Sequence, residues 1–313
     1  MSKNIVTEAK AFDSQILDRI KNGHIPDLRQ SKRNEWFYNN VWRDPEYLKM
    51  TVGKDLEIFL KYLKPESNIL EIGCGPGYFS LELARSNHHV TGVDLSPDCI
   101  ILAKKTALES SSENGFGSLN YLSGDFNSLN LNKNHFDAVV FYGALSHFPD
   151  IEITFKSVCT LLSSQGRIFV YDTSKDLYDK GDAAILYLLS AMLSVTGHYF
   201  ENVILANGNE QLTEQIDQTL KALQYVDDEG HNLQSPNDSS QTYNSTMNSL
   251  KSRFRQLYFS WESSFSKNII GGIRSKSVDE EIDIAKFIRL LEKYLIDNGK
   301  LNPAFYLYIG EKI

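Results

Sequence analysis

The sequence has few cysteines, no long hydrophobic run and no excess of positive charge, and each shortage excludes a class of protein. Its three cysteines, Cys74, Cys99 and Cys159, are widely spaced and form no C-x-x-C pair. We therefore expect free thiols, and neither a disulfide framework nor a zinc site. The most apolar run, Ala183–Val195, is interrupted by serines and is too short to cross a bilayer, so we expect no membrane partner.

The charge balance excludes a general nucleic-acid binder. The 32 Lys and Arg residues are outnumbered by 40 Asp and Glu residues, and the formal net charge is −8 at pH 7. Contacts with many phosphates need a basic surface, so no nucleic-acid partner is expected. The first residues lack the apolar core of a signal peptide, which favours a cytoplasmic location. We place no metal site on the chain.

The stretch from residue 68 to residue 94 has the order strand, glycine-rich turn, helix, strand, acid. Asn68–Ile72 is a short apolar run, Gly73–Gly77 contains three glycines, and Tyr78–Arg85 has helical character. This order predicts a βαβ unit. Glycines let the backbone approach a ligand, and a helix N-terminus offers N–H groups to an anion. The acid at the end, Asp94, suits ribose hydroxyls, so the stretch predicts a nucleotide site.

The spacing of the glycines distinguishes between two kinds of nucleotide. The dinucleotide fingerprint is G-x-G-x-x-G, whereas this turn reads G-x-G-x-G with Tyr78 at the place of the third glycine. Glu71 stands two residues before the first glycine. The stretch resembles motif I of the class I S-adenosylmethionine (SAM)-dependent methyltransferases. An acid before the glycines suits the cationic end of SAM, and glycine N–H groups suit its carboxylate.

Two later segments are also similar to this family. Ser123–Phe126, SGDF, resembles the motif whose acid bonds the adenine amino group; the alternative for Asp125 is that it only caps a turn. Gly143–Asp150 resembles the loop after the fourth strand, often written LHHxPD. The resemblance implies that SAM, and its product S-adenosylhomocysteine, are bound by Glu71, Gly73, Cys74, Gly75, Gly77, Asp94, Leu95, Asp125, Phe126, Tyr142 and Gly143.

The fourth strand supplies the candidates for catalysis. Phe136–Tyr142 is almost entirely apolar, which is typical of a central parallel strand. Its carboxyl end faces the ligand crevice, so Tyr142 and His147 are expected near the transferable methyl. His147 has a suitable reference pKa for taking a proton from a hydroxyl or an amine. The alternative is that His147 only packs against SAM or the core, because methyl transfer depends chiefly on alignment.

The alternation of strands and helices predicts an α/β fold with a doubly wound, mostly parallel, seven-stranded Rossmann-like sheet. We divide the chain into an N-terminal helical cap (1–64), the SAM-binding core (65–173), a helical insertion after the fifth strand that binds substrate (174–276), and a closing helix and strand (277–313). Helices are expected at Ile5–Ile20, Ala183–Val195, Glu210–Val226, Leu250–Phe265 and Ile282–Ile296. Asn268–Ile273 and Glu201–Leu205 compete for the sixth strand.

Substrate candidates come from segments outside the regular core. The aromatic-rich stretch Trp36–Tyr47 folds over the SAM site by resemblance, or packs the N-terminal helices onto the core. The polar stretch 227–249 is either a substrate loop or a linker. The substrate candidates are Tyr38, Trp42, His147, Asp172, His231, Asn237 and Tyr243.

The resemblance implies a SAM-dependent methyltransferase that acts on an O, N or S atom of a small metabolite. A large insertion that shapes a closed pocket favours a small molecule. No Asn/Asp-Pro-Pro-Tyr motif follows the fourth strand, which argues against methylation of the planar amine nitrogens of bases or of glutamine. The alternatives are a protein or peptide methyltransferase and a non-catalytic SAM-binding regulatory protein. The apolar faces of Ala183–Val195 and Leu250–Phe265 suit a homodimer interface as well as a pocket.

Overall fold

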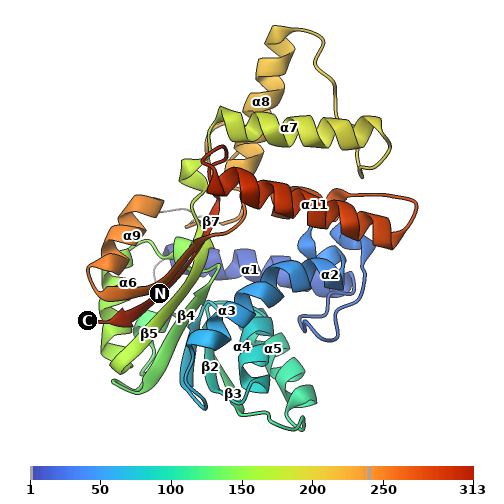
Figure 1. The fold of residues 1–313 in the computed structure, drawn as a ribbon. Coiled ribbons are helices and arrows are strands. Elements are labelled where there is room, and N and C mark those ends of the chain that lie inside the picture. Colours follow the sequence, from blue (N-terminus) through green and yellow to red (C-terminus); the bar gives the residue numbers. More distant parts are fainter. Residues whose placement is uncertain (1–2, 236, 239–240) are drawn as a thin grey trace.

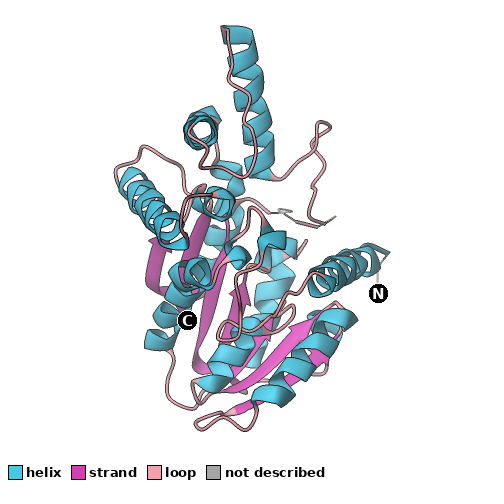
Figure 2. Cartoon of the chain, turned by 90° about the vertical axis from the view of Figure 1, so that its right-hand side faces the viewer, coloured by secondary structure: helices cyan, strands magenta, loops and turns pink. Residues whose placement is uncertain are grey.

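A twisted seven-stranded sheet, covered by helices on both faces, forms the centre of the computed structural model, which describes residues 3–235, 237–238 and 241–313 (Figures 1 and 2). The strand order is β3-β2-β1-β4-β5-β7-β6. Strands β1 to β5 pair in parallel, and β7 lies antiparallel between β5 and β6. The predicted α/β, mostly parallel Rossmann-like sheet is confirmed.

Of the seven strands, β1 and β4 have the bounds predicted from the sequence, and β6 lies where a helix was expected. Their bounds are β1 Asn68–Ile72, β2 His89–Asp94, β3 Ser118–Ser123, β4 Phe136–Tyr142, β5 Leu162–Thr173, β6 Phe254–Trp261 and β7 Phe305–Lys312. Neighbouring side chains on a strand enter different cores, because they point to opposite faces of the sheet. Ile69 packs with Phe59 and Phe79 on one face, and Leu70 packs with Phe155 on the other. The sheet is therefore buried on both sides, as its apolar central strands require.

The helices begin at residues that suit helix N-termini. Their bounds are α1 Lys3–Lys21, α2 Pro45–Leu48, α3 Lys54–Tyr62, α4 Tyr78–Arg85, α5 Pro97–Ser110, α6 Ile151–Leu161, α7 Lys180–Val195, α8 Asn209–Gln224, α9 Tyr243–Lys251, α10 Ser266–Ile269 and α11 Val278–Asp297. Shorter 3-10 turns include Glu35–Phe37, Val41–Arg43, Phe126–Ser128, Leu145–His147, Lys175–Leu177 and Ile270–Gly272, and Lys49–Gly53 is a π-helical turn. Ser96, Asp150 and Ser277 each accept a backbone N–H in the first turn of α5, α6 and α11, as N-caps do.

The sixth strand is the main error of the prediction from sequence. Leu250–Phe265, expected to be a helix, contains β6, which pairs with β7 at the edge of the sheet. The pairing shifts register between Gln256 and Tyr258, and such a bulge breaks the two-residue alternation of a strand. The aromatic side chains then fall at a spacing that imitates a helix. Neither Asn268–Ile273 nor Glu201–Leu205 is a strand. Because β6 lies within 174–276, that segment is not a purely helical insertion.

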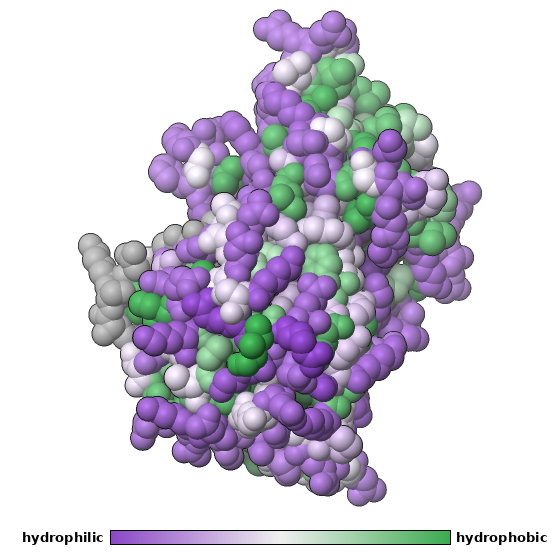
Figure 3. Space-filling view, turned by 60° about the vertical axis from the view of Figure 1, so that its left-hand side comes forward, coloured by the Kyte–Doolittle hydropathy of each residue, from purple (hydrophilic) through white to green (hydrophobic). Residues whose placement is uncertain are grey.

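Helices α7 and α8 pack on each other at one end of the molecule, above α11 in Figure 1. On α7 the side chains of Leu188, Met192 and Val195 are more than half exposed, and Figure 3 shows hydrophobic atoms gathered at this end. The apolar face of α7 is thus partly a surface feature, and the homodimer stays a prediction. Within the described chain, no helix has the length and apolar character needed to cross a bilayer.

Candidate active site

The glycine-rich turn between β1 and α4 follows a backbone path that favours glycine. Gly73, Gly75 and Gly77 all have positive φ values, of 75°, 51° and 84°. A Cβ on Gly73 would lie 2.4 Å from the Cβ of Ala144, and one on Gly77 would lie 2.3 Å from the hydroxyl of Tyr121. No side chain fits at Gly73 or Gly77. The backbone N–H groups of the turn can therefore approach a ligand that lies beyond the end of β1.

Asp94 fastens this turn to the end of β2. One carboxylate oxygen accepts the Gly75 N–H at 2.7 Å, and the other accepts the Ser96 N–H at 2.8 Å. Desolvation in the wall of the cavity described below raises the pKa of Asp94, although these two bonds act against the shift. A carboxylate fixed in this way retains further lone pairs that can accept hydroxyl protons.

Glu71 is buried beneath the same turn and accepts a hydrogen bond from the Ser80 hydroxyl of α4. Burial raises the pKa of Glu71 to about 8. The uncharged carboxyl group is therefore favoured near neutral pH until a cation approaches it.

Asp125 and Phe126 follow β3 and occupy the opposite side of the site. Asp125 accepts the N–H of Asn127 at 3.0 Å and the hydroxyl of Ser128 at 3.0 Å. It therefore caps a turn, as the alternative interpretation held, and it also lines the cavity. Phe126 is 5% exposed and presents an apolar surface beside it.

These residues surround one cavity of about 360 Å³. Of the residues predicted to bind SAM, all but Gly77 line it: Glu71, Gly73, Cys74, Gly75, Asp94, Leu95, Asp125, Phe126, Tyr142 and Gly143. Gly77 instead shapes the turn. The carboxyl ends of β1, β2 and β4 thus converge on one space, as expected for an open α/β sheet.

Helix α1 covers this cavity with one face. Ile5, Glu8, Phe12, Ile16 and Arg19, spaced by three or four residues, all line it. The helix is held in place beside α5, because Asp13 accepts the hydroxyl of Ser96 at 2.5 Å and the N–H of Asp98 at 3.2 Å. The cover expected from the stretch Trp36–Tyr47 is therefore supplied by α1.

Tyr142 forms part of the wall of the cavity. Its ring stacks between Phe79 and Tyr171, with centroids 4.3 and 4.8 Å away. Its hydroxyl donates to Asp55 at 2.8 Å, and burial raises the pKa of Tyr142 well above its ordinary value. A phenol that is this hard to ionise is a poor proton acceptor, so this geometry favours a structural role over the predicted catalytic one.

His147 lies in the cavity wall and is held by α1 and by the segment before α9. Its Nδ1 atom lies 2.9 Å from a carboxylate oxygen of Glu8 and 3.0 Å from the hydroxyl of Ser235. Its Nε2 atom lies 3.9 Å from Asp238. Burial alone lowers the pKa of His147, but the hydrogen bond to Glu8 and the charge of Asp238 outweigh it, and the net shift is upward.

The structure places one of the remaining substrate candidates in the cavity wall and the others elsewhere. Asn237 lines the cavity with His147, and Asp172 accepts the N–H of Leu145 at 2.6 Å, which fixes the loop that carries His147. Asp172 and the other four candidates do not line the cavity. Trp42 packs in the core against Tyr78, Tyr38 and His231 are exposed, and Tyr243 packs on Trp261 and Tyr306.

The residues around His147 that were missed from the sequence include Glu8, Phe12, Ser235 and Asp238. The sequence could have indicated that Glu8 is buried, because Glu8 shares a helix face with Ile5, Phe12 and Ile16. A carboxylate on the apolar face of an amphipathic helix must find a partner when buried. The partner lies 139 residues away, which no local pattern reveals.

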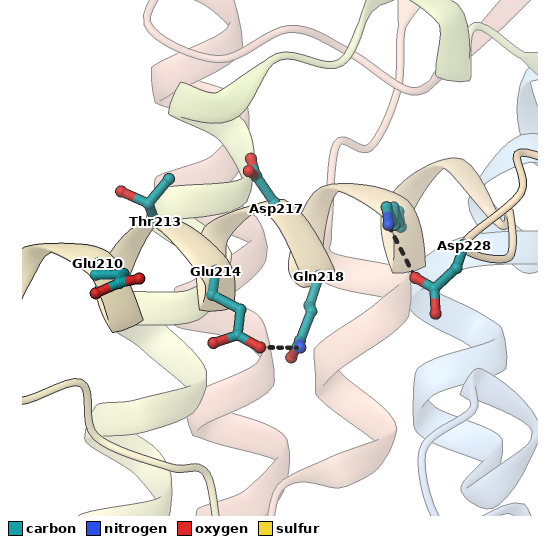
Figure 4. A pocket seen from close by; sticks show the side chains of 7 residues that line it. Glu210, Thr213, Glu214, Asp217, Gln218 and Asp228 are labelled. Carbon is teal, nitrogen blue, oxygen red and sulfur yellow. Dashed lines mark hydrogen bonds and ion pairs between the residues drawn. The ribbon is translucent and has the colours of Figure 1, made fainter.

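Two polar groups on the surface do not form a comparable site. Along α8, a hollow is lined by Glu210, Thr213, Glu214, Asp217, Gln218, Lys221 and Asp228 (Figure 4). These side chains pair with each other, as Lys221 does with Asp228 at 2.8 Å. The hollow is therefore part of a solvated helix face. Asp227, Glu229 and His231 lie within metal-ligand spacing of one another, but Glu229 and His231 are exposed, so no metal site is assigned.

Comparison with protein families identifies the domain that builds this cavity. The family model described as "Methyltransferase domain" matches residues 63–230, more than half of the chain. The match includes the glycine turn, Asp94, Asp125 and His147. Residues 1–62 and 231–313, which contain α1 and Ser235–Asp238, lie outside it.

Curated relatives match over shorter stretches. A ubiquinone biosynthesis O-methyltransferase of Xylella fastidiosa is 26% identical over 204 residues, which are 63% of this chain and 75% of that protein. A sterol 24-C-methyltransferase of Neurospora crassa is 29% identical over 147 residues, or 46% of this chain and 36% of that protein. A ubiquinone biosynthesis O-methyltransferase of Coxiella burnetii is 31% identical over 115 residues, or 35% of this chain and 47% of that protein.

Solved structures share the fold over nearly the whole chain. Geranyl diphosphate C-methyltransferase from Streptomyces coelicolor, solved with Mg²⁺, geranyl diphosphate and S-adenosylhomocysteine, has a TM-score of 0.54 and 10% identity, and the match covers 100% of this chain and 99% of that one. The cyclase SpnF has a TM-score of 0.52 and 15% identity, with 98% and 94% covered. At these identities the likeness concerns the fold alone.

Proposed function

The chain belongs to the class I SAM-dependent methyltransferases, and on that premise we propose that it methylates a small molecule bound beneath α1. The observation that carries the proposal is the single cavity of about 360 Å³ described above. It is lined both by the residues expected to hold SAM and by His147. A covered cavity of this size suits a small ligand better than a protein segment, which needs an open groove.

The cavity offers the groups that SAM requires. SAM carries a carboxylate, an ammonium, a sulfonium and an adenosine. The glycine turn presents backbone N–H groups that suit the carboxylate, and the buried Glu71 suits the cationic end. Asp94 and Asp125 are assigned to the ribose and the adenine. When bound, SAM supplies an electrophilic methyl carbon.

Two observations concern the acceptor: the first favours a small molecule, and the second favours a hydroxyl or amine nucleophile. The names of the curated relatives denote enzymes of ubiquinone biosynthesis and sterol methylation, so small acceptors are used within this family. His147 is held by Glu8 at the cavity wall, where a proton acceptor suits a hydroxyl or amine nucleophile.

The fold by itself does not exclude a different use of the cavity. A structure that covers nearly the whole chain is that of a cyclase, and a shared fold does not fix a reaction. The intact glycine turn and the carboxylates around it support SAM binding, and turnover is what the experiment below measures.

The test is transfer of isotope-labelled methyl from SAM into an extract separated into small molecules and macromolecules. The control is the Asp94→Asn variant, which keeps the size of the side chain and removes the charge that receives the ribose. Label among the small molecules with the wild type, and far less with Asp94→Asn, is the expected result. Label on protein or nucleic acid would overturn the proposed acceptor class, and SAM binding without any label would overturn methyl transfer itself.

A further inference from the structure

The imidazole of His147 is surrounded by side chains from two other segments of the chain. Glu8 comes from α1, and Ser235 and Asp238 come from the segment between α8 and α9. Glu8 is 1% exposed and Asp238 is 6% exposed. Burial of a carboxylate is costly unless the carboxylate is paired, so the burial of two carboxylates beside one histidine calls for an explanation.

Hydrogen bonding fixes which nitrogen carries the proton. The Ser235 hydroxyl donates to one oxygen of Glu8 at 2.6 Å, and the same oxygen lies 2.9 Å from Nδ1 of His147. The other Glu8 oxygen accepts the Asn237 N–H at 3.1 Å. A carboxylate only accepts hydrogen bonds, so Nδ1 carries the hydrogen of the neutral imidazole. The lone pair of the neutral ring is then on Nε2.

The charges around the ring favour its protonated form. Asp238 lies 3.9 Å from Nε2 and is itself 3.3 Å from the ammonium of Lys175. Asp172, at the end of β5, and Asp94, at the end of β2, also act on His147 through their charges. The net result is the raised pKa of His147.

We propose that Glu8 is a positioning residue for His147, and that the pair accepts the proton of an acceptor hydroxyl during methyl transfer. This inference rests on the proposed function. The acceptor oxygen forms its bond to the methyl carbon while the sulfur–methyl bond breaks and its electron pair returns to sulfur. The hydroxyl proton passes to Nε2, and Glu8 and Asp238 stabilise the imidazolium that forms.

The pair is complete only when α1 is docked. Besides Glu8, the helix is held by Asp13 at the N-terminus of α5 and by Gln15, which donates to the Gln234 carbonyl at 3.1 Å. Packing of α1 over the cavity therefore also completes the Glu8–His147 pair. The acceptor class that needs this arrangement is a hydroxyl compound, whose oxygen becomes a strong nucleophile only as its proton leaves.

The first experiment measures His147 directly and needs no acceptor. Histidine-labelled protein is titrated by ¹⁵N NMR with saturating S-adenosylhomocysteine, and the His147 signals among the seven histidines are identified by their loss in His147→Gln. We expect the Nδ1–H tautomer in the wild type. In Glu8→Gln the pKa of His147 should fall by about one unit or more, because a charge in hydrogen-bond contact is lost.

The matched control is Asp13→Asn on the same helix. It removes a charge that does not contact His147 but keeps an amide oxygen that can accept the hydrogen bonds of Ser96 and Asp98, so α1 should stay docked and the tautomer and pKa of His147 should stay as in the wild type. Wild-type values in Glu8→Gln would overturn the positioning role. Equal shifts in both variants would reduce Glu8 to one more docking contact and overturn it as well.

The second experiment tests the catalytic step with the labelled-methyl assay and its extract. Glu8→Gln should keep its affinity for S-adenosylhomocysteine within about threefold and lose about 10- to 100-fold in transfer, which is part of the roughly 10²- to 10⁴-fold that a general base contributes. Unchanged transfer in Glu8→Gln would overturn the catalytic part of the inference. Absence of transfer in the wild type would overturn the proposed function, whereas the NMR result would still decide the role of Glu8.

Discussion

The pH dependence of SAM binding provides a test of the role of Glu71. Burial raises the pKa of Glu71 to about 8 in the ligand-free protein, so its carboxyl group is mostly protonated at pH 6 and pH 7. An ammonium beside it requires the ionised carboxylate. The ligand therefore lowers the pKa of Glu71 and releases a proton on binding. Affinity should rise about tenfold per pH unit below pH 8 and level off above it.

The assay is calorimetry with S-adenosylhomocysteine at pH 6.0, 6.5, 7.0 and 7.5, in buffers with different heats of ionisation. The wild type should release about one proton per ligand at the lower pH values. The matched variant is Glu71→Gln, whose amide oxygen can still accept the hydrogen bond of Ser80. It should bind more weakly and lose most of the pH dependence, since Asp94 and His147 still titrate. Parallel pH profiles for the two proteins, or no proton release by the wild type, would refute the assignment of Glu71 to the cationic end of SAM.

Three further predictions concern Asp94, Tyr142 and Arg85. Asp94→Asn should weaken S-adenosylhomocysteine binding at least tenfold in calorimetry while the melting temperature shows an intact fold; unchanged affinity would contradict the ribose assignment. Tyr142→Phe removes the hydrogen-bond donor to buried Asp55 and should lower the free energy of unfolding by about 1–3 kcal/mol. Methyl transfer should be retained. A loss of transfer beyond about 100-fold in folded protein would restore Tyr142 as a catalytic residue. Arg85→Met should cost about 3–5 kcal/mol in urea unfolding, because Asp27, held by two bonds of 2.8 Å from Arg85, is left buried without them; a loss below about 1 kcal/mol would show that the pair contributes little.

The residues assigned to SAM could be proposed from sequence because most of them are local. Glu71, the three glycines and Asp94 lie within 24 residues of one another, and the spacing of strand, turn and helix fixes where each side chain points. Asp125 and His147 could be placed because they follow the carboxyl ends of parallel strands, which meet at one edge of the sheet.

The rest could not be predicted, for two physical reasons. Strand β6 carries a bulge between Gln256 and Tyr258, so its side chains lose the alternation by which a strand is recognised. The contacts of His147 are long-range: Glu8 lies 139 residues before it and Ser235 lies 88 residues after it. Such pairings depend on how α1 packs in three dimensions, and a spacing rule for single elements contains no information about them.

This division has a consequence for the choice of acceptor. The family match ends at residue 230 and begins at residue 63, so it contains the residues assigned to SAM and His147 itself. Glu8, Ser235 and Asp238 lie outside it and determine the tautomer and the charge of that histidine. The family therefore supports SAM as the methyl donor, whereas we expect the choice of acceptor to depend on segments outside the family match. A relative that is 26% identical over 63% of the chain predicts the donor well, and its acceptor should be transferred only if an acid equivalent to Glu8 faces the same histidine.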